Sequence, residues 1–281
     1  MTELSYALAV LSSITYGAAD FLGGLATKRS TMFSVVVFSQ LSGLILVLIS
    51  LPFLPASSAT AIDFAWGAAS GLAGGIGVAL LYRGLAIGVM SVVAPVTAVC
   101  AVIVPLVVGI TLGERPTGLA IAGVLLAIAA IVLVSQTGHT EEGRRATTGL
   151  PIAIASGIAI GIFLVFLKRT GPSAGLWPVI AARVVSVAFF TMAGLVLREK
   201  LMPRRESMPI VIGGGALDIL ANILYLLAVR RGLLSIVATL TSLYPASTII
   251  LARIVLRERL RLLQQAGVAC AAVAIVLIVS G

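Results

Sequence analysis

The stretch that decides the fold is residues 225–280, YLLAVRRGLLSIVATLTSLYPASTIILARIVLRERLRLLQQAGVACAAVAIVLIVS. Its polar residues lie between long apolar runs. The same pattern occurs 144 positions earlier without a gap. Identical residues at this offset include Ser91 and Ser235, Thr97 and Thr241, Glu114 and Glu258, Arg115 and Arg259, and Gly123 and Gly267. So many identities in one register indicate an internal duplication.

The composition is that of a chain surrounded by hydrocarbon. Apolar residues make up 60% of the chain and charged residues 10%, and the mean hydropathy is +1.18. These values indicate an integral membrane protein. The net charge of +9 comes from basic residues in short connections, where they fix topology and meet anionic lipid, so nucleic-acid binding is not expected. Cys100 and Cys270 lie inside apolar runs, which argues against a disulfide framework.

Ten apolar runs are each close to the roughly 20 residues that a helix needs to cross a bilayer. They are 4–26, 33–54, 63–86, 90–112, 117–136, 149–167, 176–197, 209–229, 234–256 and 262–280. The polar linker 137–148 separates a first repeat, 1–136, from a second, 149–281. Because each repeat has an odd number of helices, the second enters the membrane from the opposite side. We therefore predict an all-α integral membrane protein with ten transmembrane helices in two inverted-topology five-helix repeats.

Glycine and proline positions predict local features of these helices. Pro245 removes a helical hydrogen bond within the ninth run, which predicts a kink there. Glycines four residues apart predict close contacts between helices. They are Gly67, Gly71 and Gly75, Gly84 and Gly88, and Gly157 and Gly161.

The ninth and tenth runs carry a recognisable signature. Leu243-Tyr244-Pro245 is followed by Arg257-Glu258-Arg259 and then by Gln264-x-x-Gly267. This spacing resembles the Pro, Gly-Glu-Arg and Gln-x-x-Gly pattern of the EamA-type drug/metabolite transporters of the DMT superfamily. The first repeat carries Gly113-Glu114-Arg115 and Gly123, but it has Ala101 and Ala120 at the positions of Pro245 and Gln264. The second repeat has Arg257 where the pattern has glycine.

The resemblance covers nearly the whole chain and implies a carrier that moves small organic solutes by alternating access. Members of the family export amino acids, other metabolites or cationic drugs. It also implies a multi-pass protein of the bacterial cytoplasmic (inner) membrane. It leaves open the substrate, the direction, the coupling ion and whether the protein is a homodimer. The Glu-Arg pairs at 114/115 and 258/259 fall at helix junctions, where a solvated helix-end pair or a cap is favoured over a substrate contact.

Five ionisable residues fall inside apolar runs, where a charge is costly unless it faces a cavity or a partner. They are Asp20, Arg83, Arg183, Asp218 and Arg253. None recurs at the 144 offset, where the residues are Leu164, Leu227, Ser39, Gly74 and Gly109. The scaffold is repeated and the charges are not, which favours these residues as candidates for a solute cavity.

Helical spacing groups polar residues into stripes. Asp218, Asn222 and Tyr225 follow i, i+4, i+7 on the eighth helix. Tyr16 and Asp20, four apart, continue a stripe from Ser12 and Ser13 on the first helix. We therefore expect the solute to contact Tyr16, Asp20, Arg183, Asp218, Asn222 and Tyr225. Arg83, Pro245 and Arg253 are candidate gating residues or charge partners.

The intramembrane charges also fit roles without a solute. Arg183 and Asp218 lie near mid-span on consecutive helices and can neutralise one another as a packing pair. Arg83 and Arg253 lie near helix ends, from which their charges can reach the membrane surface. A cavity with both signs of charge suits export of a zwitterion such as an amino acid. The rival is a proton-coupled exporter of cationic drugs, with Asp20 or Asp218 exchanging a proton for the drug, and a passive channel is a further alternative.

Enzyme chemistry is not expected. The one histidine, His139, lies in the polar linker. No set of residues has metal-ligand spacing, and no glycine loop followed by lysine is present to hold phosphate, so we expect no metal and no cofactor. The orientation stays open, because the excess of basic residues in odd-numbered connections places both termini outside, whereas the family resemblance implies cytoplasmic termini.

Overall fold

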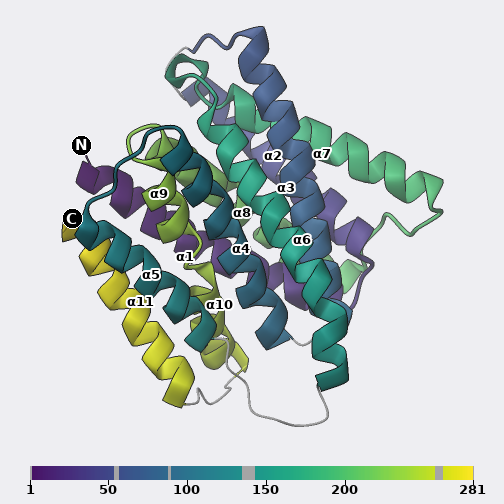
Figure 1. The fold of residues 1–281 in the computed structure, drawn as a ribbon. Coiled ribbons are helices and arrows are strands. Elements are labelled where there is room, and N and C mark those ends of the chain that lie inside the picture. Colours follow the sequence, from purple (N-terminus) through teal and green to yellow (C-terminus); the bar gives the residue numbers. More distant parts are fainter. Residues whose placement is uncertain (1, 54–56, 88–89, 135–142, 257–261, 281) are drawn as a thin grey trace.

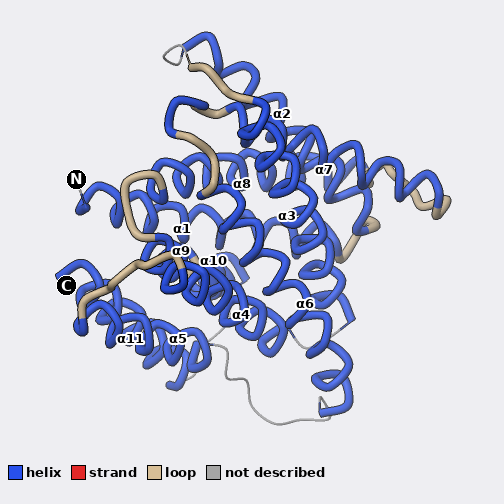
Figure 2. The backbone as a smooth tube through the Cα atoms, turned by 45° about the horizontal axis from the view of Figure 1, so that its top comes forward, coloured by secondary structure: helices blue, strands red, loops and turns tan. Residues whose placement is uncertain are grey.

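The computed structural model describes residues 2–53, 57–87, 90–134, 143–256 and 262–280 (Figure 1). These residues form helices and connections, without a strand among them (Figure 2). The α-helices are α1 (Thr2–Thr27), α2 (Met32–Ser50), α3 (Ala61–Ile87), α4 (Met90–Thr111), α5 (Gly118–Val134), α6 (Gly143–Lys168), α7 (Trp177–Val196), α8 (Met208–Val229), α9 (Leu234–Thr241), α10 (Tyr244–Leu256) and α11 (Leu262–Ser280). Short 3-10 helices are η1 (Leu51–Phe53), η2 (Pro172–Ala174) and η3 (Arg205–Ser207).

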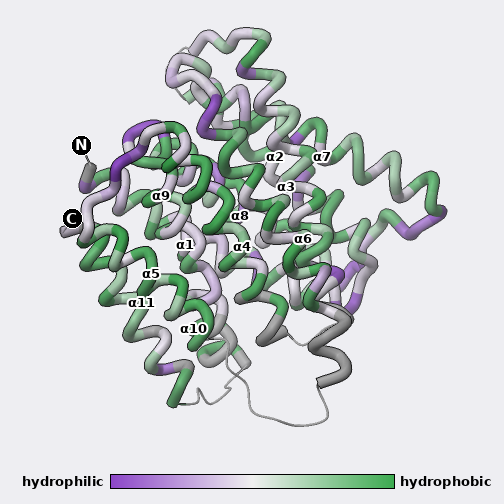
Figure 3. The backbone as a smooth tube through the Cα atoms, viewed as in Figure 1, coloured by the Kyte–Doolittle hydropathy of each residue, from purple (hydrophilic) through white to green (hydrophobic). Residues whose placement is uncertain are grey.

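Hydrophobic residues predominate along the helices, and hydrophilic residues gather at helix ends and connections (Figure 3). Leu195, Val196 and Val276 are exposed by 61%, 73% and 62%, which suits contact with lipid. Six helices of the described residues are long and apolar enough to cross a membrane: Glu3–Thr27, Met32–Phe53, Ala61–Gly84, Gly149–Lys168, Trp177–Val196 and Arg205–Val229. The shorter apolar helices are Val96–Thr111, Gly118–Leu133 and Gln265–Ile278. The predicted all-α integral membrane protein is thus confirmed.

Helices of one repeat pack mainly against helices of the other. α1 packs along α8, and α6, the counterpart of α1, packs along α3. In the same way α2 contacts α8 and α7 contacts α3. The last helices of the two repeats, α5 and α11, lie side by side (Figure 1). Each contact is matched by one in which the repeats exchange places, as expected of inverted repeats related by a two-fold axis.

Hydrogen bonds between helices repeat in the same way. The Ser12 hydroxyl of α1 donates to the carbonyl of Ala221 on α8 at 2.8 Å. The Ser156 hydroxyl of α6 donates to the carbonyl of Gly77 on α3 at 2.7 Å. The two donors are 144 positions apart in the sequence, and so are the two acceptors. Such bonds satisfy a hydroxyl that faces no water in the bilayer, and they hold the two repeats in register.

Glycines permit the closest helix approaches, as predicted. A Cβ placed on Gly71 of α3 would lie 2.1 Å from the carbonyl oxygen of Ala182 on α7. A Cβ on Gly215 of α8 would lie 2.1 Å from the carbonyl oxygen of Ser39 on α2. Both distances are below any real contact, so glycine is required there. Comparable approaches occur at Gly67, Gly75, Gly84, Gly157 and Gly161, whereas Gly88 lies outside the described residues.

The ninth predicted segment is two helices rather than one kinked helix. α9 ends at Thr241, and α10 begins at Tyr244 with Pro245 as its second residue. Proline is favoured in the first turn of a helix, because an amide there has no helical acceptor. The chain therefore breaks just before Pro245. The counterpart α4 runs through the equivalent position, Ala101, as a continuous helix.

Candidate functional site

A cavity lies between the two repeats. Its volume of about 70 Å³ is several times the roughly 10–15 Å³ that a single water molecule needs. α1, α2 and α3 of the first repeat line it together with α6 to α10 of the second. Its polar lining residues are Tyr16, Asp20, Gln40, Arg183, Ser186, Asp218, Asn222, Thr241, Ser242 and Tyr244, and its apolar ones include Val78, Leu81, Phe163, Leu164 and Val179.

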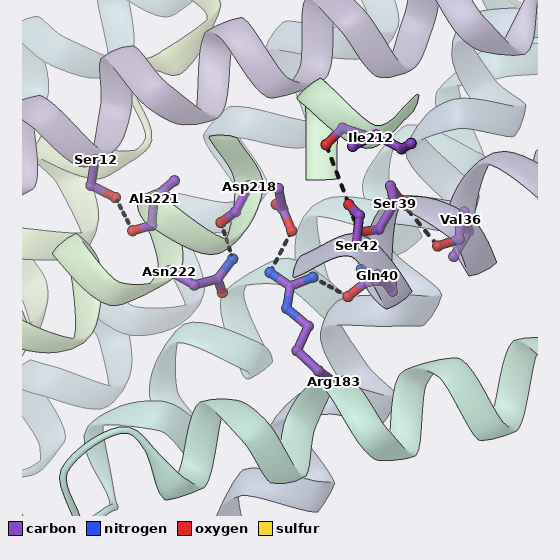
Figure 4. A network of polar contacts seen from close by, with 10 residues as sticks. All are labelled: Ser12, Val36, Ser39, Gln40, Ser42, Arg183, Ile212, Asp218, Ala221 and Asn222. Carbon is purple, nitrogen blue, oxygen red and sulfur yellow. Dashed lines mark hydrogen bonds and ion pairs between the residues drawn. The ribbon is translucent and has the colours of Figure 1, made fainter. Parts of the chain in front are cut away.

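Arg183 connects α7 to α8 and α2 at this cavity (Figure 4). Its Nη2 lies 2.5 Å from Oδ2 of Asp218, and its Nη1 donates to the side-chain oxygen of Gln40. The side chains of Arg183 and Asp218 are 5% and 21% exposed. The ion pair is thus largely removed from solvent, so each charge depends on the other for stabilisation. The predicted proximity of Arg183 and Asp218 is therefore present.

Gln40 lines the cavity but is not among the residues predicted from the sequence. The prediction starts from ionisable residues, and an amide is neutral. Its signal is a polar side chain inside an otherwise apolar run, beside Ser39, which is the position equivalent to Arg183. Gln40 is 6% exposed, and a buried amide in a membrane helix marks a hydrogen-bond partner nearby.

Asp20 differs from Asp218 in its surroundings. It lies on α1, lines the same cavity and is half-buried. Within the described residues, Asp218 has an ion pair, but no hydrogen bond or ion pair reaches the Asp20 carboxyl. The cavity therefore has two carboxyl groups and one guanidinium. A carboxylate in an apolar environment requires a cation or a proton to compensate its charge.

Four buried hydroxyls at the cavity have no hydrogen-bond partner in the described part of the chain. They belong to Tyr16, Ser186, Thr241 and Tyr244. In that part, the other unpartnered buried side-chain atoms belong to Ser207 and Arg230, outside the cavity lining. Because most buried polar groups are paired, this concentration of unpartnered hydroxyls sets the cavity lining apart from the rest of the described structure.

The predicted stripe on α8 reaches the cavity only in part. Asp218 and Asn222 line it, and the Asn222 amide donates to the backbone carbonyl of Asp218 at 2.6 Å. Tyr225 is fully buried and is not among the lining residues. Its hydroxyl donates to the carbonyl of Leu164 on α6 at 2.8 Å. One turn of helix thus separates the cavity residues from a tyrosine that joins two helices.

The predicted stripe on α1 is shortened in the same way. Tyr16 and Asp20 line the cavity. Ser12 instead bonds to α8, as described above, and the carbonyl of Ser13 accepts from the Ser247 hydroxyl at 3.1 Å. These serines are therefore helix-packing residues.

The three candidate gating or partner residues lie away from the charged centre. Arg83 is exposed on α3 and is not among the cavity-lining residues. Pro245 is buried at the start of α10, next to the lining residue Tyr244. The side chain of Arg253 lies outside the described part of the structure.

Glu114, from the signature of the first repeat, caps a helix of the second repeat. Its carboxylate accepts from the backbone amides of Leu234 and Ser235 at 2.6 and 3.0 Å and from the Ser235 hydroxyl at 2.7 Å. These groups form the first turn of α9, whose amides lack helical acceptors. Of the two expected roles, a solvated helix-end pair or a cap, Glu114 therefore has the second. Glu258 lies outside the described residues.

Basic residues form hydrogen bonds between helix ends on the side of the bundle where Glu114 caps α9. Lys168, at the end of α6, donates to the carbonyl of Val229, the last residue of α8, and to the carbonyl of Gly232 in the connection that follows. Arg230 donates to the carbonyls of Gly171 and Gly175 at 2.9 Å each. Partial burial lowers the pKa of Arg230, and the Asp63 carboxylate opposes that shift. The positions equivalent to Lys168 and Arg230 in the first repeat are Gly24 and Ala86. Neither residue has a side-chain donor, so neither can form the equivalent hydrogen bonds.

The sequence pattern of the EamA-like transporter family matches residues 3–136 and again residues 147–280. The chain belongs to the EamA-like transporter family. A solved structure titled only "Crystal structure of protein" has 15% sequence identity and a TM-score of 0.73, over 95% of this chain and 97% of that one. At this identity the likeness supports the fold alone. A search of curated proteins finds no match.

Members of the EamA-like family are transporters, and the two matched segments account for the symmetric packing of α1 to α5 with α6 to α11. The cavity lies between these segments, where inverted repeats form solute sites. Among the described residues, no group of three His, Cys, Asp or Glu lies together as metal ligands would. The polar groups at the cavity are thus one ion pair, one unpaired carboxyl, two amides and several hydroxyls.

Proposed function

We propose that this EamA-family protein is a secondary carrier that exports a small polar or amphipathic metabolite, an amino acid or a related zwitterion, by alternating access. The observation that supports this proposal is the cavity between the repeats, with a buried Arg183–Asp218 pair and a carboxyl of Asp20 that has no partner among the described residues. A site between inverted repeats opens to one side and then to the other as the repeats move against each other.

The solute's ammonium group compensates Asp20 in this proposal. The solute's carboxylate approaches Arg183, whose planar guanidinium has five N–H donors. Two of its nitrogens already donate to Gln40 and Asp218. Ser186 lies three residues after Arg183 on the same face of α7, and its unpartnered hydroxyl supplies a further donor to the carboxylate. Both charged ends of a zwitterion are thereby paired, as burial of charge requires.

The surplus of acidic groups favours one alternative, a proton-coupled exporter of cationic drugs. In that case Asp20 binds a proton or the cation in turn, and Arg183 serves only to neutralise Asp218. Such a carrier requires no carboxylate on its solute.

Counterflow in proteoliposomes tests these alternatives. Vesicles are loaded with unlabelled L-leucine, and uptake of labelled L-leucine is followed in the presence of 4-methylpentanoate, which lacks the amino group, or 3-methylbutylamine, which lacks the carboxylate. Equivalent sets based on alanine and phenylalanine cover smaller and larger side chains. We expect saturable counterflow of at least one zwitterion, with each analogue competing roughly tenfold more weakly, because it leaves a polar group of the site unpaired.

Different results assign the function differently. An amine that is carried better than its zwitterion, and only with a pH gradient, would establish the cationic-drug exporter. Currents through single proteins without counterflow would establish a passive channel. Asp20→Asn provides the internal control, because it should abolish carriage of any solute bearing an ammonium group.

A further inference from the structure

The two repeats use the same threonine differently. Thr97 on α4 and Thr241 at the end of α9 occupy equivalent positions. The Thr97 hydroxyl donates to the carbonyl of Ala153 on α6 at 3.1 Å. By symmetry the acceptor for Thr241 would be the carbonyl of Ala9 on α1. The Thr241 hydroxyl instead has no partner in the described structure, although Thr241 is only 2% exposed.

The break between α9 and α10 explains this difference. The amide of Leu243 donates to the carbonyl of Leu240 at 3.3 Å, a tighter i to i−3 contact than in an α-helix. The chain thus turns directly after Thr241, and Thr241 lines the cavity. In the first repeat α4 continues as a regular helix, and Thr97 is not a lining residue.

Tyr244 stands on the other side of the same break. It is 6% exposed, it lines the cavity, and its hydroxyl has no partner among the described residues. Its backbone lies against α1, because a Cβ on Gly17 would be 2.5 Å from the Tyr244 carbonyl oxygen. Gly17 follows Tyr16, another cavity residue. The equivalent residue in the first repeat is Cys100, which has no hydroxyl.

The break therefore places two residues with buried, unpartnered hydroxyls in the lining of the cavity, which α1 lines with Tyr16 and Asp20. We propose that the break between α9 and α10 is a binding element of the solute site, in which Thr241 and Tyr244 accept hydrogen bonds from the solute's ammonium group while Asp20 compensates its charge. An ammonium has three N–H donors and no acceptor. One carboxylate oxygen and two hydroxyl oxygens match that requirement.

This inference rests on the proposed function in one respect, namely that the solute carries an ammonium group. It does not depend on a carboxylate at the other end. It holds equally for a zwitterion and for a cationic amine, so its test is separate from the choice between those two functions.

Isosteric variants separate a binding hydroxyl from a structural one. Thr241→Val and Tyr244→Phe remove hydroxyls that have no protein partner in the described structure, whereas the matched controls Thr97→Val and Tyr225→Phe remove hydroxyls bonded to Ala153 and Leu164. We expect the first two variants to unfold at the wild-type temperature. The two controls should unfold at a lower temperature, because each loses a buried side-chain hydrogen bond between two helices.

Binding should change in the opposite pattern. We expect Thr241→Val and Tyr244→Phe each to raise the KM for L-leucine, or the Kd for 3-methylbutylamine, by roughly tenfold, which is the effect of one hydrogen bond to a charged group. Competition by 4-methylpentanoate, which has no ammonium group, should be unchanged. Thr97→Val should leave every one of these constants at its wild-type value.

Three results would overturn the assignment. Loss of stability in Thr241→Val equal to that in Thr97→Val would show that the Thr241 hydroxyl has a structural partner. Unchanged KM and Kd in Thr241→Val and Tyr244→Phe would show that the break between α9 and α10 does not contact the solute. If the wild-type protein binds neither L-leucine nor 3-methylbutylamine, the inference that the solute carries an ammonium group is refuted. If it binds 3-methylbutylamine but not L-leucine, only the proposal of a zwitterionic solute is refuted.

Discussion

Asp218→Asn is the most informative single change, because it keeps the size of the side chain and removes one charge of a buried pair. Two unit charges at the observed 2.5 Å attract one another by roughly 7 kcal/mol at an effective dielectric constant of about 20. Most of this attraction offsets desolvation. The variant therefore measures the free-energy cost of burying an uncompensated guanidinium at Arg183, whose side chain is 5% exposed. We expect a loss of about 3 kcal/mol in the free energy of unfolding, the lower end of the usual range, because Asp218 retains some contact with solvent.

The opposite change should cost less. Arg183→Gln leaves Asp218 without its cation, but a carboxylate can take up a proton, whereas a guanidinium cannot release one. We expect a loss of about 1–2 kcal/mol for Arg183→Gln. The double variant Arg183→Gln/Asp218→Asn has no buried charge left uncompensated. Its stability should return to within about 1 kcal/mol of the wild type, so the two changes are strongly non-additive.

The measurement is a double-mutant cycle of unfolding free energies in detergent, with solute counterflow measured on the same four proteins. Arg83→Gln is the matched control, since Arg83 also lies in an apolar run but is exposed, and it should change stability by no more than about 0.5 kcal/mol. The expected double variant is stable and inactive. A double variant with wild-type transport would refute the site assignment, and an Asp218→Asn variant as stable as the wild type would refute the reasoning about burial.

Two further predictions concern the scaffold. Glu114→Gln weakens the cap on α9, so we expect a loss of about 1–2 kcal/mol in unfolding free energy with an unchanged KM, while the exposed Arg115→Gln has little effect. A several-fold change of KM in well-folded Glu114→Gln protein would contradict this. Gly71→Ala places a methyl group against Ala182, so we expect a loss of about 1–3 kcal/mol. The control Gly118→Ala meets no atom within 4 Å, and its unfolding free energy should stay within about 0.5 kcal/mol of the wild type. An unfolding free energy of Gly71→Ala equal to that of Gly118→Ala would contradict the prediction, because it would show that α3 and α7 move apart without cost.

The sequence predicts the helices well because run length and hydropathy depend on the bilayer rather than on tertiary packing. It predicts the ninth segment less well. Pro245 locates a disturbance, but proline at the start of a helix and proline inside a kinked helix have the same local sequence. The break at Thr241 depends on how α9 and α10 pack against α1 and α4, which no local pattern contains.

The polar stripes have a similar limit. Helical spacing identifies which residues share a face, but it does not say whether that face meets a cavity or a neighbouring backbone. Asp218 and Asn222 meet the cavity, whereas Tyr225 meets the carbonyl of Leu164. Gln40 escapes a search for charges because the cost of burying an amide is smaller than that of a charge, yet its bond to Arg183 makes it part of the same polar cluster.

Departures from the internal symmetry mark the cavity more sharply than the repeated contacts do. Where both repeats keep the same contact, as in the bonds from Ser12 and Ser156, the contact holds helices together. Where one repeat departs, as at Thr241 compared with Thr97, the hydroxyl has no bond to a neighbouring helix in the described structure, and its residue lines the cavity. Asp20 and Arg183 follow the same rule, because neither has a charged counterpart. A duplicated carrier can therefore acquire a specific site through a few unmatched residues while its two-fold packing, on which alternating access depends, stays intact.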